Sequence, residues 1–463
     1  MLDDKLNRAL MEAIKKKNIK KAKYLIDLGA NVCEMVDGLS VLDVAKETND
    51  EDVISFVKES LVNEFKKVLN SNKSADVIDA IYSANKGRKN ITKKEANKLG
   101  MRLLKAVDDN SLLEVKKLVS EGANLDFKDK NGTTALLKAC FNDRIDMVNV
   151  LIKGGANVHI VDNQGWTCLM ATGSILVAKR LVEKGVDIEF RDDENNTALI
   201  VQAQNGKTDV VEYLIKVGAN IDAQCEQGTT SLMEAIDERQ WNTAELLVNE
   251  GANLDLKDVD GDNALSWGVL RGNEKFVMDL IDKGGNVNTC DNKGVSLLML
   301  AVDEKMIDLA KKIIDCGGDV NCKDKDKNTA LMIASYNGYV EGVDLLLKNG
   351  AQIENKNNEG KTALLFAVKN GEKDVVKMLL DNNANINAID DKGESSLIYA
   401  VKAENEEMVD LLLKRGCDTT IRNNANKTAL KIAENENIKK MIVDEMKRKN
   451  IKTGNLWDRI TRR

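Results

Sequence analysis

A 33-residue period runs through most of this chain and limits what it can fold into. The period is clearest in Lys327 to Ala351, KNTALMIASYNGYVEGVDLLLKNGA, where two apolar stripes at helical spacing flank Asn337-Gly338. This glycine suits a tight turn because it takes positive φ without strain. Two helices this short cannot bury both stripes by themselves. The phrase therefore predicts a fold in which copies of one two-helix unit stack against each other.

The copies align on the residue three positions before the Ala of Thr-Ala-Leu, here called the register residue. The register residues are Leu99, Gly132, Gly165, Asn195, Gly228, Gly261, Gly294, Lys327, Gly360, Gly393 and Asn426. Each step is 33 residues except the step from Gly165 to Asn195, which is 30. We place the three missing residues in the turn between the two helices, around Gly173-Ser174, because a turn loses residues at less cost than a helix.

Gly-x-Thr-Ala-Leu, an Asn-Gly turn, Val-Val-x-x-Leu-Leu and Gly-Ala-Asn at this period resemble the ankyrin repeat, over residues 99 to about 449. The resemblance implies an all-α ankyrin-repeat solenoid of helix-turn-helix repeats with short β-hairpin-like loops, forming an elongated, curved superhelix. Where the family commonly has Thr-Pro-Leu-His, this chain has Thr-Ala-Leu-Leu or Thr-Ser-Leu-Met. The family uses that His to tie loops together, so its loss bears on loop rigidity and not on the fold.

The period divides the chain into four parts. Residues 1–60 hold two copies of the phrase and predict an N-terminal two-repeat ankyrin module. Residues 98–449 predict an array of about eleven ankyrin repeats including its caps. Residues 450–463 predict a C-terminal tail, whose apolar Leu456, Trp457 and Ile460 are candidates for docking or binding.

The remaining stretch, residues 61–97, fits no copy and has two interpretations. LVNEFKKVLN continues a helix, SADVIDAIYSAN predicts another and GRKN predicts a turn. Thr92 and Glu95 then have the spacing of a capping box at the start of the next helix. The stretch is either a helical connector between the module and the array, or a degenerate repeat that keeps the stack continuous.

Composition and hydropathy exclude several classes of protein. A net charge of −7 over 463 residues argues against a general nucleic-acid binder. No stretch approaches 18 uninterrupted apolar residues, and the N-terminus lacks a signal-peptide run, so we expect a cytoplasmic protein that does not insert into a membrane. Unconventional export would leave no trace in these features. The oligomeric state is open, with a monomer favoured.

Residues that carry chemistry are scarce. The eight cysteines form no Cys-x-x-Cys pair and the single histidine, His159, lies in a predicted loop, so small buried thiols and a solvated imidazole are expected. Gly360-Lys361-Thr362 imitates the end of a phosphate loop, but Asn355 stands where that motif needs a glycine. We predict no catalytic site, no cofactor and no metal.

Binding is therefore expected on the surface, in a row that we call the first-helix column, nine residues after each register residue. It reads Asp108, Phe141, Ser174, Gln204, Asp237, Leu270, Asp303, Tyr336, Lys369 and Lys402. The ankyrin resemblance implies that this end of the first helix and the loop tips form a concave face. Apolar residues occur in the column where the fold does not require them, and acidic pairs alternate with them. This composition is typical of protein-binding hot spots, although scattered surface residues are an equally good reading of any single one.

The predicted partner-binding residues are Phe141, Trp166, Asp237, Leu270, Asp303, Tyr336 and Lys369. A tip column, in the loops, has six basic residues among ten: Lys128, Val161, Arg191, Gln224, Lys257, Cys290, Lys323, Lys356, Ile389 and Arg422. This basic edge either suits a partner of mixed charge or keeps strand-like tips from associating.

These features predict a non-enzymatic scaffold or adaptor that binds a protein partner through the concave face of an ankyrin solenoid. The alternative is a secreted or host-directed effector whose array targets a host protein, or the targeting part of an enzyme complex. Residues 61–97 and the tail are too few and too plain to supply a catalytic domain.

Overall fold

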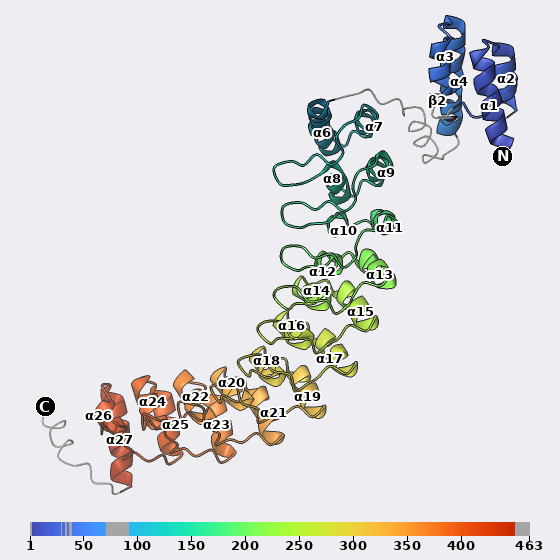
Figure 1. Ribbon diagram of the computed structural model, residues 1–463. Helices are drawn as coiled ribbons and strands as arrows, with labels where there is room; N and C mark the ends of the chain where they lie inside the picture. The colour runs from blue at the N-terminus through green and yellow to red at the C-terminus, as the bar shows by residue number, and fades with distance from the viewer. Residues whose placement is uncertain (1, 29, 33–34, 37–38, 71–91, 450–463) are drawn as a thin grey trace. The chain divides into compact units, whose positions relative to one another are not determined.

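The computed structural model describes residues 2–28, 30–32, 35–36, 39–70 and 92–449. The chain divides into two compact units, Met1–Gln202 with Asp209–Ala219, and Ala203–Thr208 with Asn220–Arg463. Short paired helices build each unit (Figure 1), which confirms the helix-turn-helix repeats predicted from the period.

The first unit begins with two helix pairs and a short antiparallel hairpin. These elements are α1 (Leu2–Lys15), α2 (Ile19–Asp27), β1 (Met35–Val36), β2 (Leu39–Ser40), α3 (Val41–Glu47) and α4 (Glu51–Asn70). Ser40 opens α3 with a capping box. Its hydroxyl accepts a hydrogen bond from the Asp43 N–H at 3.1 Å, and the Asp43 carboxylate accepts one from the Ser40 N–H at 3.2 Å.

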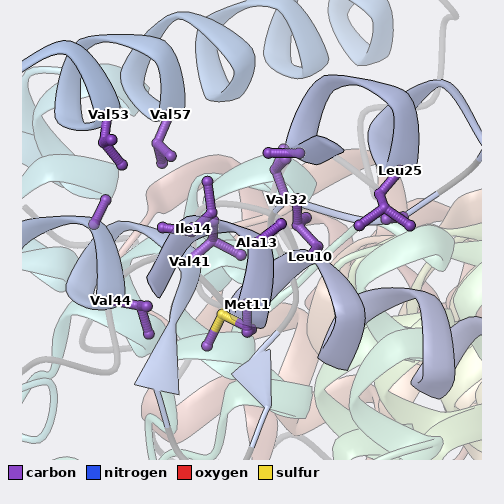
Figure 2. Packing of buried hydrophobic residues seen from close by; sticks show 13 residues of the cluster. Leu10, Met11, Ala13, Ile14, Leu25, Val32, Val41, Val44, Val53 and Val57 are labelled. Atoms are coloured by element: carbon purple, nitrogen blue, oxygen red, sulfur yellow. The ribbon is translucent and has the colours of Figure 1, made fainter. Parts of the chain in front are cut away.

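An apolar core holds these helices together, and Figure 2 shows its buried side chains. Leu10 and Ile14 of α1, Val44 of α3 and Val57 of α4 are almost fully buried in it. Among the side chains that the structure describes, the members of the cluster and the half-buried side chains packed against it lie between residues 6 and 61. This part of the chain therefore supplies its own core.

The stretch that fits no repeat is described only at its two ends. α4 runs to Asn70, which confirms the predicted continuation of a helix through residues 61–70. The helix predicted at 74–85, the turn at 87–90 and the tail at 450–463 lie outside the described residues.

The capping box predicted before the array is confirmed. The Thr92 hydroxyl accepts a hydrogen bond from the Glu95 N–H at 3.3 Å, and the Glu95 carboxylate accepts one from the Thr92 N–H at 2.8 Å. The hydrogen bond from the Thr92 N–H, together with one from the Thr92 hydroxyl, stabilises the ionised carboxylate and lowers the pKa of Glu95. The helix that opens here is α6, and the first unit continues with α6 (Lys93–Asp108), α7 (Leu112–Ser120), α8 (Ala135–Phe141), α9 (Ile145–Gly154), α10 (Cys168–Ala171) and α11 (Ile175–Val182).

Two further helices, α12 (Ala198–Gln204) and α13 (Thr208–Lys216), contain residues of both units. The second unit continues with α14 (Ser231–Asp237), α15 (Trp241–Asn249), α16 (Ala264–Leu270), α17 (Glu274–Asp282), α18 (Leu297–Asp303), α19 (Ile307–Asp315), α20 (Ala330–Tyr336), α21 (Val340–Lys348), α22 (Ala363–Asn370), α23 (Lys373–Asp381), α24 (Ser396–Lys402), α25 (Glu406–Lys414), α26 (Ala429–Ile432) and α27 (Glu436–Arg448).

The Thr of Thr-Ala-Leu caps the first helix of its repeat. In α20, the Thr329 hydroxyl accepts a hydrogen bond from the Met332 N–H, and Thr329 is buried. Such a side chain satisfies one of the backbone donors that a helix leaves unpaired at its start. Where Thr is absent, Ser or Asn caps the helix in the same way: Ser296 caps α18 and Asn263 caps α16.

The prediction for the short repeat was wrong about where its residues are missing. The turn after α10 spans residues 172–174, the same length as the turn 142–144 after α8. The helix itself is shorter, since α10 has 4 residues and α8 has 7. Hydrogen bonds from the Thr172 hydroxyl and the Gly173 N–H to the Asp143 carboxylate hold this turn in place. The loop between the helices therefore keeps its length, and the three missing residues are the last helical turn of α10.

The loops are held by hydrogen bonds that do not need the missing His. In the loop before α8, the Asp129 carboxylate accepts hydrogen bonds from the Asn131 and Thr133 N–H groups at 2.9 and 3.0 Å. The Asn163 N–H of the next loop then donates to the Asn131 carbonyl at 3.0 Å, and its side-chain amide donates to the Lys130 carbonyl. Loop rigidity thus comes from Asp and Asn side chains and from backbone contacts between neighbouring loops.

Candidate functional site

In each unit the first helices and the adjoining loops form a surface that we call the first-helix face. The first-helix column lies on it, at the C-terminal ends of the first helices. Its apolar members are open to solvent: Phe141 is 68% exposed, Tyr336 45% and Leu270 42%. An exposed aromatic or leucine at a helix end contributes little to the stack, so these positions are available to a partner.

A hollow of about 440 Å³ lies on this face in the first unit, and we call it the first-unit hollow. Phe141 and Trp166, predicted separately from the sequence, both line it. Trp166 is half-buried, and its backbone N–H donates to the Asp162 carboxylate at 2.9 Å. The structure therefore brings two predicted aromatic residues into one site.

The short helix α10 borders this hollow. In a regular repeat the first helix continues for another turn and carries a residue of the first-helix column. Here α10 ends at Ala171, which lines the hollow, and Ser174 falls just before α11 instead of at a first-helix end.

A lysine compensates part of the acidic charge in the first-unit hollow. The Lys138 ammonium donates to both carboxylate oxygens of Asp108, at 2.9 and 3.0 Å, and lies 3.7 Å from the Asp129 carboxylate. Both Asp108 and Lys138 line the hollow. Asp162 lines it as well, and its carboxylate accepts hydrogen bonds from backbone N–H groups.

The second unit has a hollow of about 520 Å³ on its first-helix face, here called the second-unit hollow. Tyr336 of α20 and Phe366 of α22 line it, with ring centroids 6.1 Å apart and ring planes at 81°. This edge-to-face contact fixes both rings. Asp303, at the end of α18, also lines the hollow, so the predicted Asp303 and Tyr336 meet in one site.

Two carboxylates of the second-unit hollow differ in their partners. The Asp303 carboxylate accepts a hydrogen bond from the neutral Asn337 amide at 2.7 Å. Glu359 forms an ion pair with Lys361, and this cation lowers the pKa of Glu359. Lys361 itself is buried with its ammonium 5.7 Å from the centroid of the Phe366 ring.

Leu270 and Asp237 lie in neighbouring repeats of the second unit, outside both hollows. Arg271 forms an ion pair with Asp237 and stacks over the Trp267 ring, with 4.8 Å from its guanidinium carbon to the ring centroid. The Trp267 indole N–H donates to the Asp258 carboxylate at 2.9 Å. The predicted acidic site at Asp237 is thus occupied by an arginine of the same chain.

Lys369 is exposed in the last turn of α22 and does not line the second-unit hollow. It lies near enough to Glu359 to contribute to the lowered pKa of that carboxyl. Its place beside the hollow keeps it a candidate for binding.

The tip column has a structural role that the sequence analysis did not anticipate. The Lys128 ammonium donates to the Val161 carbonyl at 2.7 Å, and Lys257 and Lys356 reach the corresponding carbonyls of Cys290 and Ile389 at 2.6 and 2.9 Å. Each of these bonds joins one loop to the loop of the next repeat, 33 residues later. Three of the six basic tip residues therefore tie neighbouring loops together, whereas Arg191 and Arg422 donate to carbonyls of their own loops.

Two aromatic residues that were not predicted as binding residues, Trp267 and Phe366, are half-buried, and Phe366 lines the second-unit hollow. Each lies six residues after its register residue, as does Lys138. The period could have identified these residues as candidates for binding. The position six residues after the register residue lies about one helical turn before the first-helix column and therefore on the same face of the helix.

The thiols behave as small side chains. Cys140, Cys168 and Cys417 are buried and Cys316 is exposed. Burial raises the pKa of Cys140 well above its usual value and that of Cys417 to about 12, so these thiols stay protonated. Within the described residues, no group of three or more His, Cys, Asp or Glu side chains is placed to hold a metal ion. None of the described helices is both long and apolar enough to cross a membrane.

Comparisons with known proteins agree with the repeat pattern. The family model for Ankyrin repeats (3 copies) matches residues 103–192, 171–258, 242–324 and 298–390, and the model for Ankyrin repeats (many copies) matches residues 379–433. A search of curated proteins gave no match. Among solved structures, the chain is similar to the ankyrin repeat domain of Bcl-3, a unique member of the IkappaB protein family. The identity is 26% and the TM-score 0.43, covering 47% of this chain and 100% of that chain.

Proposed function

Because the chain belongs to the ankyrin repeat family, whose repeats are generally protein–protein interaction modules, we propose that it is a non-enzymatic scaffold or adaptor. Its partner is a protein, which binds through the first-helix face, the side that the family resemblance makes concave. The partner-binding residues are those predicted from the sequence, joined by Phe366 and Trp267.

One observation carries this proposal: exposed aromatic residues stand beside hollows on the first-helix face of each unit. Phe141 with Trp166, and Tyr336 with Phe366, offer rigid apolar area at the edge of a concavity. Interfaces place their energetically dominant side chains in such pockets, and aromatic residues are enriched among them.

The experiment is affinity purification with the full chain and with a variant carrying Phe141→Ala, Leu270→Ala and Tyr336→Ala. We expect the variant to lose the specific partner, since each hot-spot truncation weakens binding by about 2 kcal/mol or more. Circular dichroism should show unchanged helical content because the three side chains are exposed.

A matched control changes three exposed apolar residues outside the first-helix face, Tyr24→Ala, Leu113→Ala and Leu176→Ala. These residues lie on second helices, α2, α7 and α11. The control should keep the partner. A partner that survives the first triple substitution, or disappears equally in both variants, would contradict binding through the first-helix face.

A further inference from the structure

The three acidic pairs of the first-helix column are not equivalent, because their leading carboxylates meet different groups from the next repeat. Asp108 meets the ammonium of Lys138, and Asp237 meets the guanidinium of Arg271. Asp303 meets only the amide of Asn337. Asn337 and Arg271 occupy the same position of the repeat, ten residues after their register residues. An amide donates a hydrogen bond but leaves the charge uncompensated, so Asp303 keeps its negative charge for another partner.

A second carboxylate of the same kind lines the second-unit hollow. Asp326 is exposed in the loop before α20, a different element from α18, which carries Asp303. In the described part of the chain, neither carboxylate has a Lys or Arg within ion-pair distance, and no Lys or Arg lines the hollow. The lining of the second-unit hollow thus combines apolar side chains and four asparagines with these two exposed carboxylates, which we call its rim.

The apolar interior is made of side chains on three consecutive first helices. Leu300 of α18, Ile333 and Tyr336 of α20 and Phe366 of α22 line it. One aromatic ring is already engaged, because the Lys361 ammonium lies near Phe366. Tyr336 is the ring left for a cation from outside, and it is half exposed.

We propose that the second-unit hollow binds a protein segment in which a large apolar side chain stands next to arginine or lysine. The apolar side chain enters the hollow of about 520 Å³, and the cation pairs with Asp303 and Asp326 beside the Tyr336 ring. This inference rests on the proposed function and adds the chemistry of the partner. Acidic segments are repelled by the same carboxylates, and nucleic acids are repelled for the same reason.

The first-unit hollow provides an internal contrast. Its Asp108 is already paired with Lys138, which also lines the hollow, and its other lining carboxylate, Asp162, accepts hydrogen bonds from the Gln164 and Trp166 N–H groups. Selectivity for basic segments should therefore be stronger at the second-unit hollow than at the first.

The experiment is selection of a random 12-residue peptide display library on the full chain. The enriched peptides that lose binding to Tyr336→Ala are synthesised with a fluorescent label and titrated by fluorescence polarisation. We expect them to pair a large apolar residue with Arg or Lys, and Tyr336→Ala to weaken binding at least about tenfold. Removing one rim charge, in Asp303→Asn, should weaken binding about two- to fivefold, as for an exposed ion pair, and added salt should erase that difference.

A sharper variant is Asn337→Arg, which copies the position of Arg271 and supplies Asp303 with a cation from its own chain. It leaves every carboxylate in place and should still weaken the basic peptides about as much as Asp303→Asn. The matched control is Asn142→Arg, at the same repeat position beside the first-unit hollow, which should leave their binding unchanged.

Three outcomes would overturn the inference: enriched peptides without an excess of Arg and Lys, no enrichment of peptides that depend on Tyr336, or unchanged binding to Asn337→Arg. Self-association of the chain that Asp303→Asn abolishes would also overturn it, by identifying a second copy as the occupant. Each of these leaves the proposed function standing if the triple Ala variant still loses its partner in affinity purification. Retention of that partner would instead reject the proposed function itself.

Discussion

At the scale of single residues, Gln202 shows how one side chain compensates for a missing helical turn. Its position in the repeat is Ala or Gly in most copies, including Ala139, Ala235 and Gly268. Gln202 is 1% exposed, and its amide donates to the carbonyls of Leu169 and Met170 at 3.1 and 2.8 Å. These carbonyls lose their usual donors because α10 ends at Ala171. The long polar side chain fills the space and satisfies the helix end.

We therefore expect Gln202→Ala to lower the free energy of unfolding by about 2–3 kcal/mol, through a cavity and two unpaired carbonyls. Urea unfolding followed by circular dichroism measures the shift. Gln202→Leu keeps the volume and separates the two causes, while the exposed Gln204→Ala serves as control. A midpoint as high in Gln202→Ala as in the parent chain would show that α10 needs no such support.

At the scale of elements, α27 is longer and more polar than α25, the second helix of the repeat before it. α27 has 13 residues, against 9 in α25, and its buried Glu445 forms ion pairs with Arg448 and Lys449 at 2.8 and 3.2 Å. The hydrogen bonds from Arg448 lower the pKa of Glu445. The ionised carboxylate is therefore more stable in the folded chain than in the unfolded one.

This shift predicts a pH-dependent contribution of α27 to stability. The contribution of Glu445 to the free energy of unfolding is fully present above the ordinary carboxyl pKa of 4.5. It is lost as the pH falls through the lowered pKa that Glu445 has in the folded chain. Glu445→Gln should therefore cost about 0.5–1 kcal/mol at pH 7 and less at a pH of about 3. Urea unfolding at the two pH values measures this, with the exposed Glu434→Gln as control. An equal cost at both pH values would exclude the ion pairs as its source.

At the scale of the whole molecule, the N-terminal helices have a core of their own. Among the described residues, the cluster around Leu10 draws its members from residues 6–61. This supports the proposal that residues 1–60 are a two-repeat module and that 61–97 are a connector to the array of 98–449. In a continuous stack, by contrast, each repeat shares its core with the next.

Hydrogen exchange of the full chain distinguishes the two arrangements. Leu10→Ala removes a fully buried side chain and should cost about 2–5 kcal/mol in the N-terminal core. We expect amide protection to fall between residues 2 and 70 and to stay unchanged between 92 and 449. Ala9→Gly, a smaller change on the same helix, controls for helix propensity. Loss of protection that spreads into α6 and α7 would favour the degenerate repeat that continues the stack.

Much of this architecture follows from local properties of the chain. The helix pairs, the Thr caps and the glycine turn at Gly338, whose φ is 64°, all depend on residues within one repeat. Exposure of Phe141, Leu270 and Tyr336 follows from the same period, because each repeat buries the same positions. The sequence alone therefore determined the repeat and the surface that is free to bind.

The tertiary structure decided what that surface offers. Asp237 and Asp303 stand at one position of the period, but a guanidinium neutralises the first and only an amide meets the second. These partners come from the next repeat. Which side chain reaches which carboxylate depends on contacts between repeats, and the spacing of residues does not specify those contacts. The shortened α10 behaves the same way, since Gln202 stabilises its end from a neighbouring helix. A period determines where side chains recur, whereas contacts between repeats determine which charges and hollows remain open to a partner.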